Sequence, residues 1–245
     1  MPHFFVEKIA IQGEFIKISD KENYNHIARS LHMKVGEKLL IVDDEQIQYE
    51  TVIKEITSNT IISCIEKSYP SKRVLPINIY LAQSVLKKEA QTDVIKKACE
   101  LGVKGIYPII TDNSTIKKSH AVEKIEKYNK LSYEASKQCE RPDIAPVYDV
   151  TDLESIINNN DFNIKIACVE KNAAFTLKTY LNTLSIGNKD KILVIIGPEG
   201  GFSQREFEIL KNSNIAMVSL GNLILRADTA VIAALSNIIY GLCNE

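Results

Sequence analysis

Two glycine-rich turns near the C-terminus hold the residues of this chain that are best suited to bind a small ligand. The first, Gly-Pro-Glu-Gly-Gly at 197–201, follows the apolar run Ile192–Ile196. The second begins at Gly221, after the apolar run 216–220, and leads to Arg226. Because glycine has no side chain, such turns let a ligand touch backbone N–H and C=O groups. Neither turn has a phosphate-loop pattern, which favours a nucleoside ligand without a polyphosphate tail.

The segments around the turns predict strands and helices of a parallel sheet. Ser203 and Glu206 form a capping-box pattern, so a helix should begin there. After the second turn apolar residues recur at helical spacing, and Asp228 or Thr229 could cap that helix. If the two strands are neighbours, both turns lie at the carboxyl edge of the sheet, where open α/β sheets bind ligands. One strand–glycine–helix junction is usually structural, whereas two in succession favour a binding site.

The C-terminal part of the chain alternates between strand and helix patterns, which predicts an α/β domain with a mostly parallel sheet. Besides the two strands above, we expect strands at 77–82, 105–110 and 163–169 and helices at 91–101, 121–139 and 175–184. The N-terminal part is richer in strand patterns, at 4–18, 39–42, 49–53 and 60–65. It also has one helical face, 24–31, with Asp20 as a plausible cap. The sequence therefore predicts a domain at 1–70, a linker at 71–76 and a second domain at 77–245.

Composition narrows the class of protein. The chain has 45% hydrophobic and 25% charged residues, as ordinary globular proteins do, and no run of eighteen apolar residues that could span a membrane. Its N-terminus lacks the pattern of a signal peptide. The five cysteines contain no Cys-x-x-Cys pair and the four histidines no ligand spacing, so we expect reduced thiols, no metal site and a cytoplasmic protein. The net charge of −1 means that any nucleic-acid surface must be local, as at the lysine pairs 87–88, 96–97 and 117–118.

The two turns together carry a resemblance to a known family. Residues 197–203, Gly-Pro-Glu-Gly-Gly-Phe-Ser, and 220–230, Leu-Gly-Asn-Leu-Ile-Leu-Arg-Ala-Asp-Thr-Ala, resemble the SPOUT methyltransferases, and most closely the ribosomal RNA small subunit methyltransferase E family. That family methylates N3 of a uridine in small-subunit (16S) ribosomal RNA. The resemblance implies S-adenosyl-L-methionine as cofactor and ribosomal RNA or the 30S subunit as partner. It also implies a homodimer, a trefoil knot in the C-terminal domain and a PUA-like β-barrel that binds RNA at the N-terminus.

The resemblance assigns the cofactor to both turns. Backbone groups there would read the adenine and the ribose, and apolar side chains of the second turn would enclose the ring, as is usual in small-molecule sites. The expected cofactor-binding residues are Gly197, Glu199, Gly200, Gly201, Leu220, Gly221, Ile224, Leu225 and Arg226.

Methylation of uridine N3 also requires that its proton leave. Arg226 is the candidate to stabilise the resulting anion, and Glu199 and Asp228 are the candidates to remove the proton. The alternative for Arg226 is a structural salt bridge to one of these two carboxylates. The family usually has Glu at the position of Asp228.

Five further residues match positions that line the family's substrate cleft or contact RNA: Arg29, Ser114, Glu134, Gln138 and Arg141. On residues alone, the last three are equally well explained as exposed helix positions. The chain departs from the family at three arginines, which are His3, His32 and Asn113 here, so phosphate contacts should be weaker. Two alternatives remain: a SPOUT enzyme that acts on another RNA, such as a tRNA ribose, and a non-catalytic RNA-binding or assembly factor.

Overall fold

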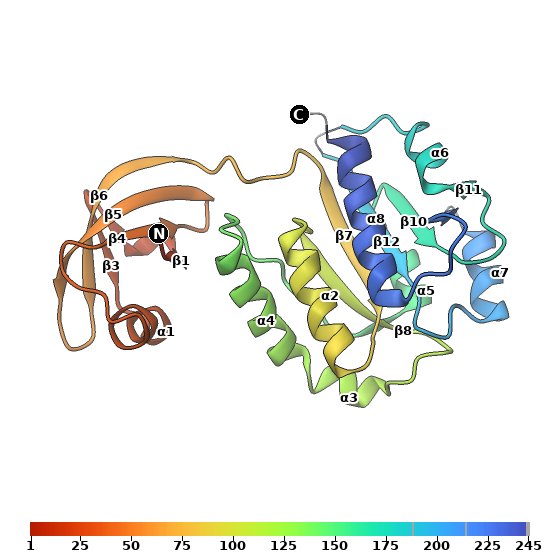
Figure 1. Ribbon diagram of the computed structural model, residues 1–245, viewed down its shortest axis with the longest axis horizontal. Helices are drawn as coiled ribbons and strands as arrows, with labels where there is room; N and C mark the ends of the chain where they lie inside the picture. The colour runs from red at the N-terminus through yellow and green to blue at the C-terminus, as the bar shows by residue number, and fades with distance from the viewer. Residues whose placement is uncertain (188, 214, 244–245) are drawn as a thin grey trace. The chain divides into compact units, whose positions relative to one another are not determined.

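The computed structural model describes residues 1–187, 189–213 and 215–243, and the chain divides into two compact units (Figure 1). The first unit comprises residues 1–74 together with 136–143. The second comprises 75–135 and the described residues from 144 onwards. No helix in the described part of the chain is both long and apolar enough to cross a bilayer.

The first unit contains a six-stranded sheet. Along the sheet the strands are β1 (His3–Phe5), β4 (Lys38–Val42), β5 (Ile47–Ile56), β6 (Ile61–Pro70), β3 (Phe15–Ile18) and β2 (Ile11–Gln12). All pairs are antiparallel except β1 with β4. The β5–β6 register shifts at two places, and such irregularities bend and twist a sheet. The core below it consists of Phe4, Ile16, Ile18, Ile27, Leu39, Ile41, Ile53 and Ile61.

The predicted helix of this unit begins where expected but has unusual geometry. The Asp20 side chain accepts a hydrogen bond from the N–H of Asn23 at 2.8 Å and caps α1 (Lys21–Tyr24). From Asn25 to Ser30 the backbone is π-helical, and the turn ends at His32 with a φ of 52°. A short helix η1 (Lys8–Ala10) precedes β2.

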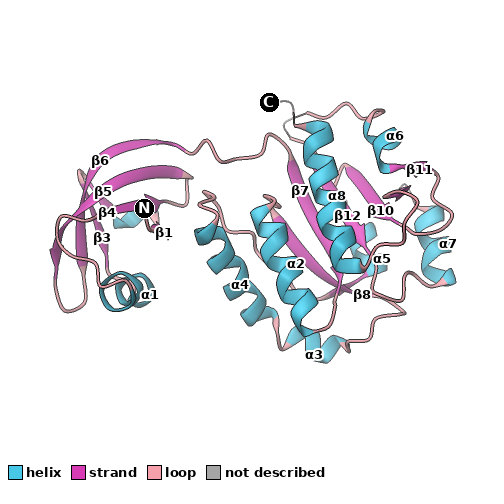
Figure 2. Ribbon diagram, in the orientation of Figure 1, coloured by secondary structure: helices cyan, strands magenta, loops and turns pink. Residues whose placement is uncertain are grey.

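The second unit contains a parallel sheet of seven strands, covered by helices on both faces (Figure 2). The strand order is β11 (Phe175–Thr176), β13 (Ala216–Ser219), β10 (Ile164–Cys168), β12 (Lys191–Ile196), β7 (Asn78–Ser84), β8 (Gly105–Ile110) and β9 (Thr151–Asp152). The helices of this part of the chain are α2 (Lys88–Glu100), α3 (Lys118–Val122), α4 (Ile125–Gln138), α5 (Leu153–Ile157), α6 (Leu177–Leu181), α7 (Gln204–Asn212) and α8 (Ala227–Leu242).

Strand β12 shows why the apolar run has no alternation. Ile192, Val194 and Ile196 pack in the core cluster that contains α2, α6 and α8 residues, while Leu193 and Ile195 pack in the cluster of α5 and α7. Both faces of the strand are therefore buried, which is what a run of β-branched residues without polar partners predicts.

The strand order settles whether the two strands that precede the glycine turns are neighbours. β12 and β13 are not neighbours, because β10 lies between them: Ile166 pairs with Val194 on one side and with Ala216 on the other. All three strands are parallel, so both glycine turns still lie at the carboxyl edge. After β12 the chain passes through α7 and re-enters the sheet as β13 on the far side of β10, because β10 already pairs with β12 on that side.

Local differences from the prediction have local causes. The helix expected at 121–139 is two helices, α3 and α4, with Glu123 and Lys124 between them. The segment 175–184 begins as the edge strand β11, and Thr176 caps the shorter helix α6 by accepting from the N–H of Thr179. Arg226, with extended backbone, holds the N-cap position of α8, so neither Asp228 nor Thr229 caps that helix. The short elements β9 and α5 were not predicted.

Candidate functional site

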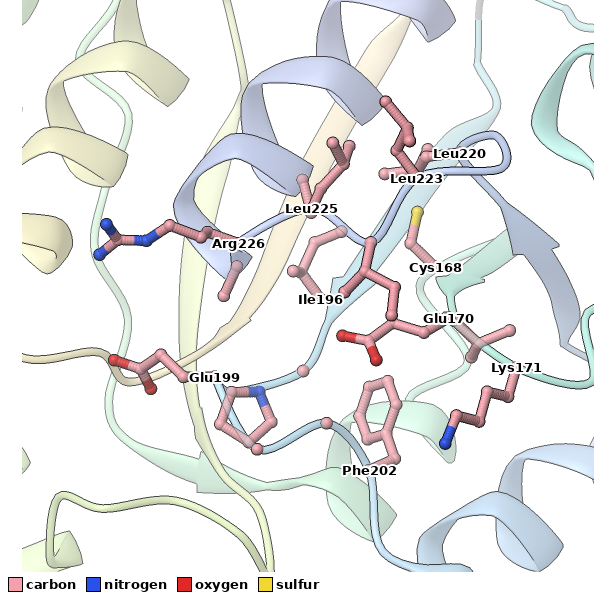
Figure 3. Close-up of a pocket in the computed structure, with 18 of the residues that line it drawn as sticks. Cys168, Glu170, Lys171, Ile196, Glu199, Phe202, Leu220, Leu223, Leu225 and Arg226 are labelled. Carbon is pink, nitrogen blue, oxygen red and sulfur yellow. The ribbon is translucent and has the colours of Figure 1, made fainter.

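The carboxyl ends of β10, β12 and β13 surround a cavity of about 580 Å³ (Figure 3). Three segments line it, one after each strand: 168–171, 196–202 and 220–227, with Phe207 and Ala230 completing the wall. Every residue expected from the sequence to bind the cofactor is on this wall, from Gly197 to Arg226. The two turns, which are separate in the sequence, therefore line the same cavity.

The first turn has a backbone that only small residues suit. The N–H of Gly201 donates to the carbonyl oxygen of Pro198 at 2.9 Å, and Gly201 has a φ of +67°. A Cβ on Gly197 would lie 3.2 Å from the Phe202 ring, so that ring packs directly against the turn. The expected capping box follows: Ser203 Oγ accepts from the N–H of Glu206, and Glu206 Oε2 accepts from the N–H of Ser203 at 2.9 Å.

The second turn offers unused backbone donors. The N–H groups of residues 221–225 make no hydrogen bond to any residue that the structure describes. Gly221 has a φ of +132°, a conformation that other residues rarely adopt. A ligand in the cavity can therefore accept hydrogen bonds from this turn without displacing a bond within the protein.

The cavity wall is largely apolar. Ile196, Phe202, Leu220 and Leu225 line it, while Leu223 at the rim is 81% exposed. Cys168 closes the end of β10, and burial raises the pKa of its thiol to about 12, so it is a neutral wall residue at physiological pH. Flat apolar groups such as a nucleobase suit a site of this kind.

Charged side chains come from all three segments, and the one from the third, Arg226, is the N-cap of α8. Glu170 and Lys171 follow β10, and Glu199 and Arg226 are both drawn on the left of the view in Figure 3. The Arg226 side chain is 82% exposed, and its Nε lies 3.7 Å from Oδ1 of Asp228. There is no ion pair between Arg226 and Glu199, two residues that the structure describes.

Asp228 lies outside the cavity wall. It faces Arg226, and its Oδ1 accepts a hydrogen bond from the N–H of Thr229 at 2.9 Å. Of the two carboxylates expected to remove a proton, only Glu199 borders the cavity.

The residues expected to contact RNA are in different surroundings. In the second unit, Ser114 Oγ bonds to Ser84 Oγ at 2.9 Å, and Glu134 is exposed. The others belong to the first unit. Gln138 and Arg29 are exposed, and the Arg29 guanidinium lies 6.0 Å from the centroid of the Tyr24 ring.

Arg141 differs from the others in being buried. Its side chain is 6% exposed and its Nε donates to Oδ1 of Asp143 at 2.9 Å. It is therefore not an exposed helix residue, which was the alternative to a role in the substrate cleft.

One wall of the cavity was not anticipated. The segment 168–171 has no glycine, so the pattern of a glycine turn does not identify it. The strand that it follows was predicted, and the rule that ligands bind beyond the carboxyl ends of parallel strands would have identified it. Among the described residues, no group of three or more His, Cys, Asp or Glu side chains is placed to hold a metal ion.

Comparison with known proteins agrees with this geometry. Residues 73–239 match the RNA methyltransferase domain family, and residues 18–65 match the RNA methyltransferase PUA domain. Ribosomal RNA small subunit methyltransferase E of Aquifex aeolicus is 31% identical over 71% of this chain and 74% of its own. The protein of the same name from Bacillus subtilis is 26% identical over 89% of this chain and 88% of its own.

A solved structure shows the same fold. A protein from Legionella pneumophila, solved in complex with S-adenosylmethionine as cofactor, superposes with a TM-score of 0.83 at 25% identity, covering 97% of this chain and 96% of that one. The match to the RNA methyltransferase domain spans most of the chain, and the Aquifex relative is similar over most of its length. With two glycine turns around one cavity at the carboxyl edge of a parallel sheet, this chain belongs to the ribosomal RNA small subunit methyltransferase E family of RNA methyltransferases.

Proposed function

We propose that this protein transfers a methyl group from S-adenosyl-L-methionine to N3 of a uridine in the ribosomal RNA of the small subunit. The observation that carries the proposal is the cavity formed jointly by the two glycine turns, with backbone donors at 221–225 that no described residue uses. The relatives named above are small-subunit ribosomal RNA methyltransferases, and the Legionella structure contains the cofactor.

The cavity fits the chemistry of the cofactor. Its apolar wall, which includes Ile196, Leu220 and Leu225, suits the adenine ring, and the free N–H groups of the second turn suit the acceptor atoms of adenine. Glu170 and Lys171 are the polar side chains nearest the end of β10 and suit hydroxyl or charged groups. S-adenosylmethionine supplies a methyl group attached to a positively charged sulfur, so the protein must chiefly align it with the acceptor.

Arg226 and Glu199 are proposed to act on the uridine. The proton on N3 would first pass to a carboxylate, and the negative charge left on the base would be spread over N3, O2 and O4. N3 would then bond to the methyl carbon as the bond from that carbon to sulfur breaks, which leaves a neutral methylated base and a neutral thioether. Arg226, at the cavity rim and 82% exposed, can hold that charge with a preorganised guanidinium. Glu199 is the better placed proton acceptor because it borders the cavity, whereas Asp228 faces Arg226 and is proposed to orient it.

The remaining expectations complete the proposal. Residues 1–70 would bind RNA, 71–76 would link, and 77–245 would form the knotted catalytic domain. Arg29, Ser114, Glu134, Gln138 and Arg141 would support the RNA contact, directly or by holding the surfaces that make it. A ribosomal RNA target supports a location in the cytoplasm.

A homodimer is also proposed. Large apolar side chains remain exposed on the second turn and on α8: Leu223 at 81%, Ile224 at 74% and Tyr240 at 89%. Exposed large apolar side chains along one helix and the turn before it support a surface that another protein covers. Light scattering of the purified protein should give twice the chain mass, and a monomer at micromolar concentration would contradict this part of the proposal.

The decisive experiment uses small subunits from a strain that lacks the corresponding gene. The purified protein is incubated with these subunits and methyl-labelled S-adenosylmethionine, and the product is mapped by nuclease digestion and mass spectrometry. We expect 3-methyluridine at a single position of the small-subunit RNA. Label on a ribose, on cytosine or on tRNA would overturn the assignment. If calorimetry detects no binding of the cofactor, the protein is instead a non-catalytic RNA-binding factor.

A further inference from the structure

A loop outside the cavity wall holds the first glycine turn. Residues 111–114 connect β8 to the segment before α3. The side-chain amide of Asn113 donates from Nδ2 to two consecutive carbonyl oxygens, that of Gly200 at 3.2 Å and that of Gly201 at 3.0 Å. A Cβ on Gly200 would lie only 3.2 Å from Cβ of Asn113, so the two loops are in tight contact.

The loop that carries Asn113 is itself fixed. The N–H of Thr111 donates to Ser114 Oγ at 2.9 Å, and Thr111 Oγ1 lies 2.7 Å from Oγ of the buried Ser84. The N–H of Asp112 donates to Oε1 of Glu206 at 2.9 Å. Asn113 therefore projects from a short segment that hydrogen bonds anchor on both sides, and its amide can impose an orientation on a partner.

The two hydrogen bonds from Asn113 to the Gly200 and Gly201 carbonyl oxygens determine the direction in which the first glycine turn points its N–H groups. In a trans peptide the N–H points opposite to the C=O of the preceding residue. The N–H that follows the Gly200 carbonyl is that of Gly201, which bonds to Pro198. The N–H that follows the Gly201 carbonyl is that of Phe202, which makes no hydrogen bond to a described residue and belongs to a residue of the cavity wall. Fixing the Gly201 carbonyl toward Asn113 thus fixes the Phe202 N–H away from it.

We infer that Asn113 is a positioning residue that preorganises the first glycine turn for its ligand. Two glycines in sequence, one with positive φ, leave the turn many alternative backbone conformations, and ordering such a turn on binding costs affinity. The Asn113 amide removes part of that cost before the ligand arrives. The effect on cofactor binding rests on the proposed function, whereas the effect on the turn itself does not.

The test compares three substitutions in the full chain. Asn113→Ala removes both hydrogen bonds, Asn113→Asp replaces the donor by a carboxylate that faces two carbonyl oxygens, and Asn113→Gln restores an amide on a longer arm. The control is Asn78→Ala. Asn78 is the first residue of β7, at the amino edge of the same sheet, and its side-chain amide donates to the carbonyl oxygen of Asp190.

We expect Asn113→Ala to weaken binding of S-adenosylmethionine about five- to tenfold by calorimetry, the loss of one to two ordinary hydrogen bonds. Asn113→Asp should bind more weakly still, Asn113→Gln should recover part of the affinity, and Asn78→Ala should bind like the wild type. The KM for the cofactor should rise while kcat at saturation changes little. Because Asn113 is exposed, the melting temperature of the ligand-free protein should stay within about 2 °C.

Hydrogen exchange separates this inference from the proposed function. In the ligand-free protein, the amide of Gly201, which its hydrogen bond to Pro198 protects, should exchange faster in Asn113→Ala than in the wild type or in Asn78→Ala. Unchanged exchange together with unchanged affinity would overturn the role of Asn113. If the wild type does not bind the cofactor, the proposed function fails, and the exchange of the Gly201 amide alone decides whether Asn113 orders the turn.

Discussion

Arg205 and Asp112 form a two-pronged ion pair, with Nη2 2.8 Å from Oδ1 and Nε 3.0 Å from Oδ2. Arg205 lies in the first turn of α7, and Asp112 lies in the loop after β8. Ser203 Oγ also donates to Oδ2 of Asp112 at 2.5 Å. The start of α7, and with it the end of the first glycine turn, is therefore attached to the neighbouring loop by charge as well as by the Asn113 amide.

The ion pair should make the stability of the folded protein depend on pH in the acid range. Hydrogen bonds from Arg205 and then Ser203 lower the pKa of Asp112 from 3.8 to about 2. A lowered folded-state pKa contributes stability above pH 4, and this contribution is lost as the pH falls from about 4 to about 2. We therefore expect the melting temperature of the wild type to exceed that of Asp112→Asn at pH 6, with the difference shrinking toward pH 2.

The difference at pH 6 should be modest, since the Asp112 side chain is 37% exposed and water screens such pairs. Scanning calorimetry at four pH values measures it. A difference that stays constant down to pH 2 would show that the Asp112 charge contributes nothing to folding.

Glu206 should tolerate substitution less well than Asp112, because its side chain is buried (1% exposed) and accepts hydrogen bonds from two loops. Oε1 accepts from the N–H of Asp112 and Oε2 from the N–H of Ser203, each at 2.9 Å. Glutamine in its place has one oxygen, so one of these two N–H groups, each in a part-buried hydrogen bond, would face an NH₂ group. We expect Glu206→Gln to lower the free energy of unfolding by about 1–3 kcal/mol in urea titrations.

Glu208→Gln is the matched control, on the same helix but exposed. It should change the free energy of unfolding by less than about 0.5 kcal/mol. Equal stability of the two variants would mean that the Glu206 carboxylate is not needed by both loops.

Arg226→Ala tests the proposed catalytic role. Because the side chain is 82% exposed, its removal should leave folding intact. Loss of one preorganised group that stabilises the anion should reduce kcat about 10²- to 10³-fold, while the Kd of the cofactor stays within a few-fold. Single-turnover kinetics and calorimetry on the same preparation measure both. Parallel loss of turnover and cofactor affinity would contradict the role of Arg226 and assign it to binding.

Gly221→Ala tests whether the second turn needs its glycine. A Cβ there meets no atom within 4 Å, but the φ of +132° is unfavourable for alanine, so the turn should change conformation. We expect cofactor affinity to fall by about tenfold. Gly36→Ala is the control, since Gly36 has a φ of +93° and equally open surroundings in the first unit. It should destabilise its unit without changing affinity, and equal binding by both variants would contradict the prediction.

His3 predicts a second pH dependence, within the first unit. Burial is the main cause that lowers its pKa from 6.5 to about 4, and the nearby charges of Lys137 and Arg73 add to the effect. The unfolded chain therefore takes up a proton between pH 6.5 and pH 4 that the folded chain does not, and stability falls over this range as the pH decreases. Relative to His3→Gln, the wild type should lose roughly 2 kcal/mol between pH 7 and pH 4.5 in urea titrations. A parallel response of the two proteins would exclude His3 as the cause.

Features encoded by a few adjacent residues could be predicted from the sequence. The capping box at Ser203, the cap at Asp20 and the buried strand before Gly197 all depend on local hydrogen bonding or on an apolar run. The structure also groups the two glycine turns, because parallel strands place their carboxyl ends at one edge.

What was missed depends on contacts between distant segments. The position of β10 between β12 and β13 is a property of the whole sheet, and no local pattern records it. The same holds for the segment 168–171 and for Asn113. The two residues that accept hydrogen bonds from Asn113 lie 87 and 88 positions further along the chain. At Arg226, an extended backbone replaces the polar side-chain cap that the neighbouring Asp and Thr suggested.

The insertion of β10 fixes the width of the ligand site. Adjacent strands lie about 4.8 Å apart, so the ends of β12 and β13 are held roughly 10 Å from one another by main-chain hydrogen bonds through the strand between them. No side chain sets that span. Because main-chain pairing alone sets this breadth, exchanging one apolar side chain for another in these strands would leave it unaltered.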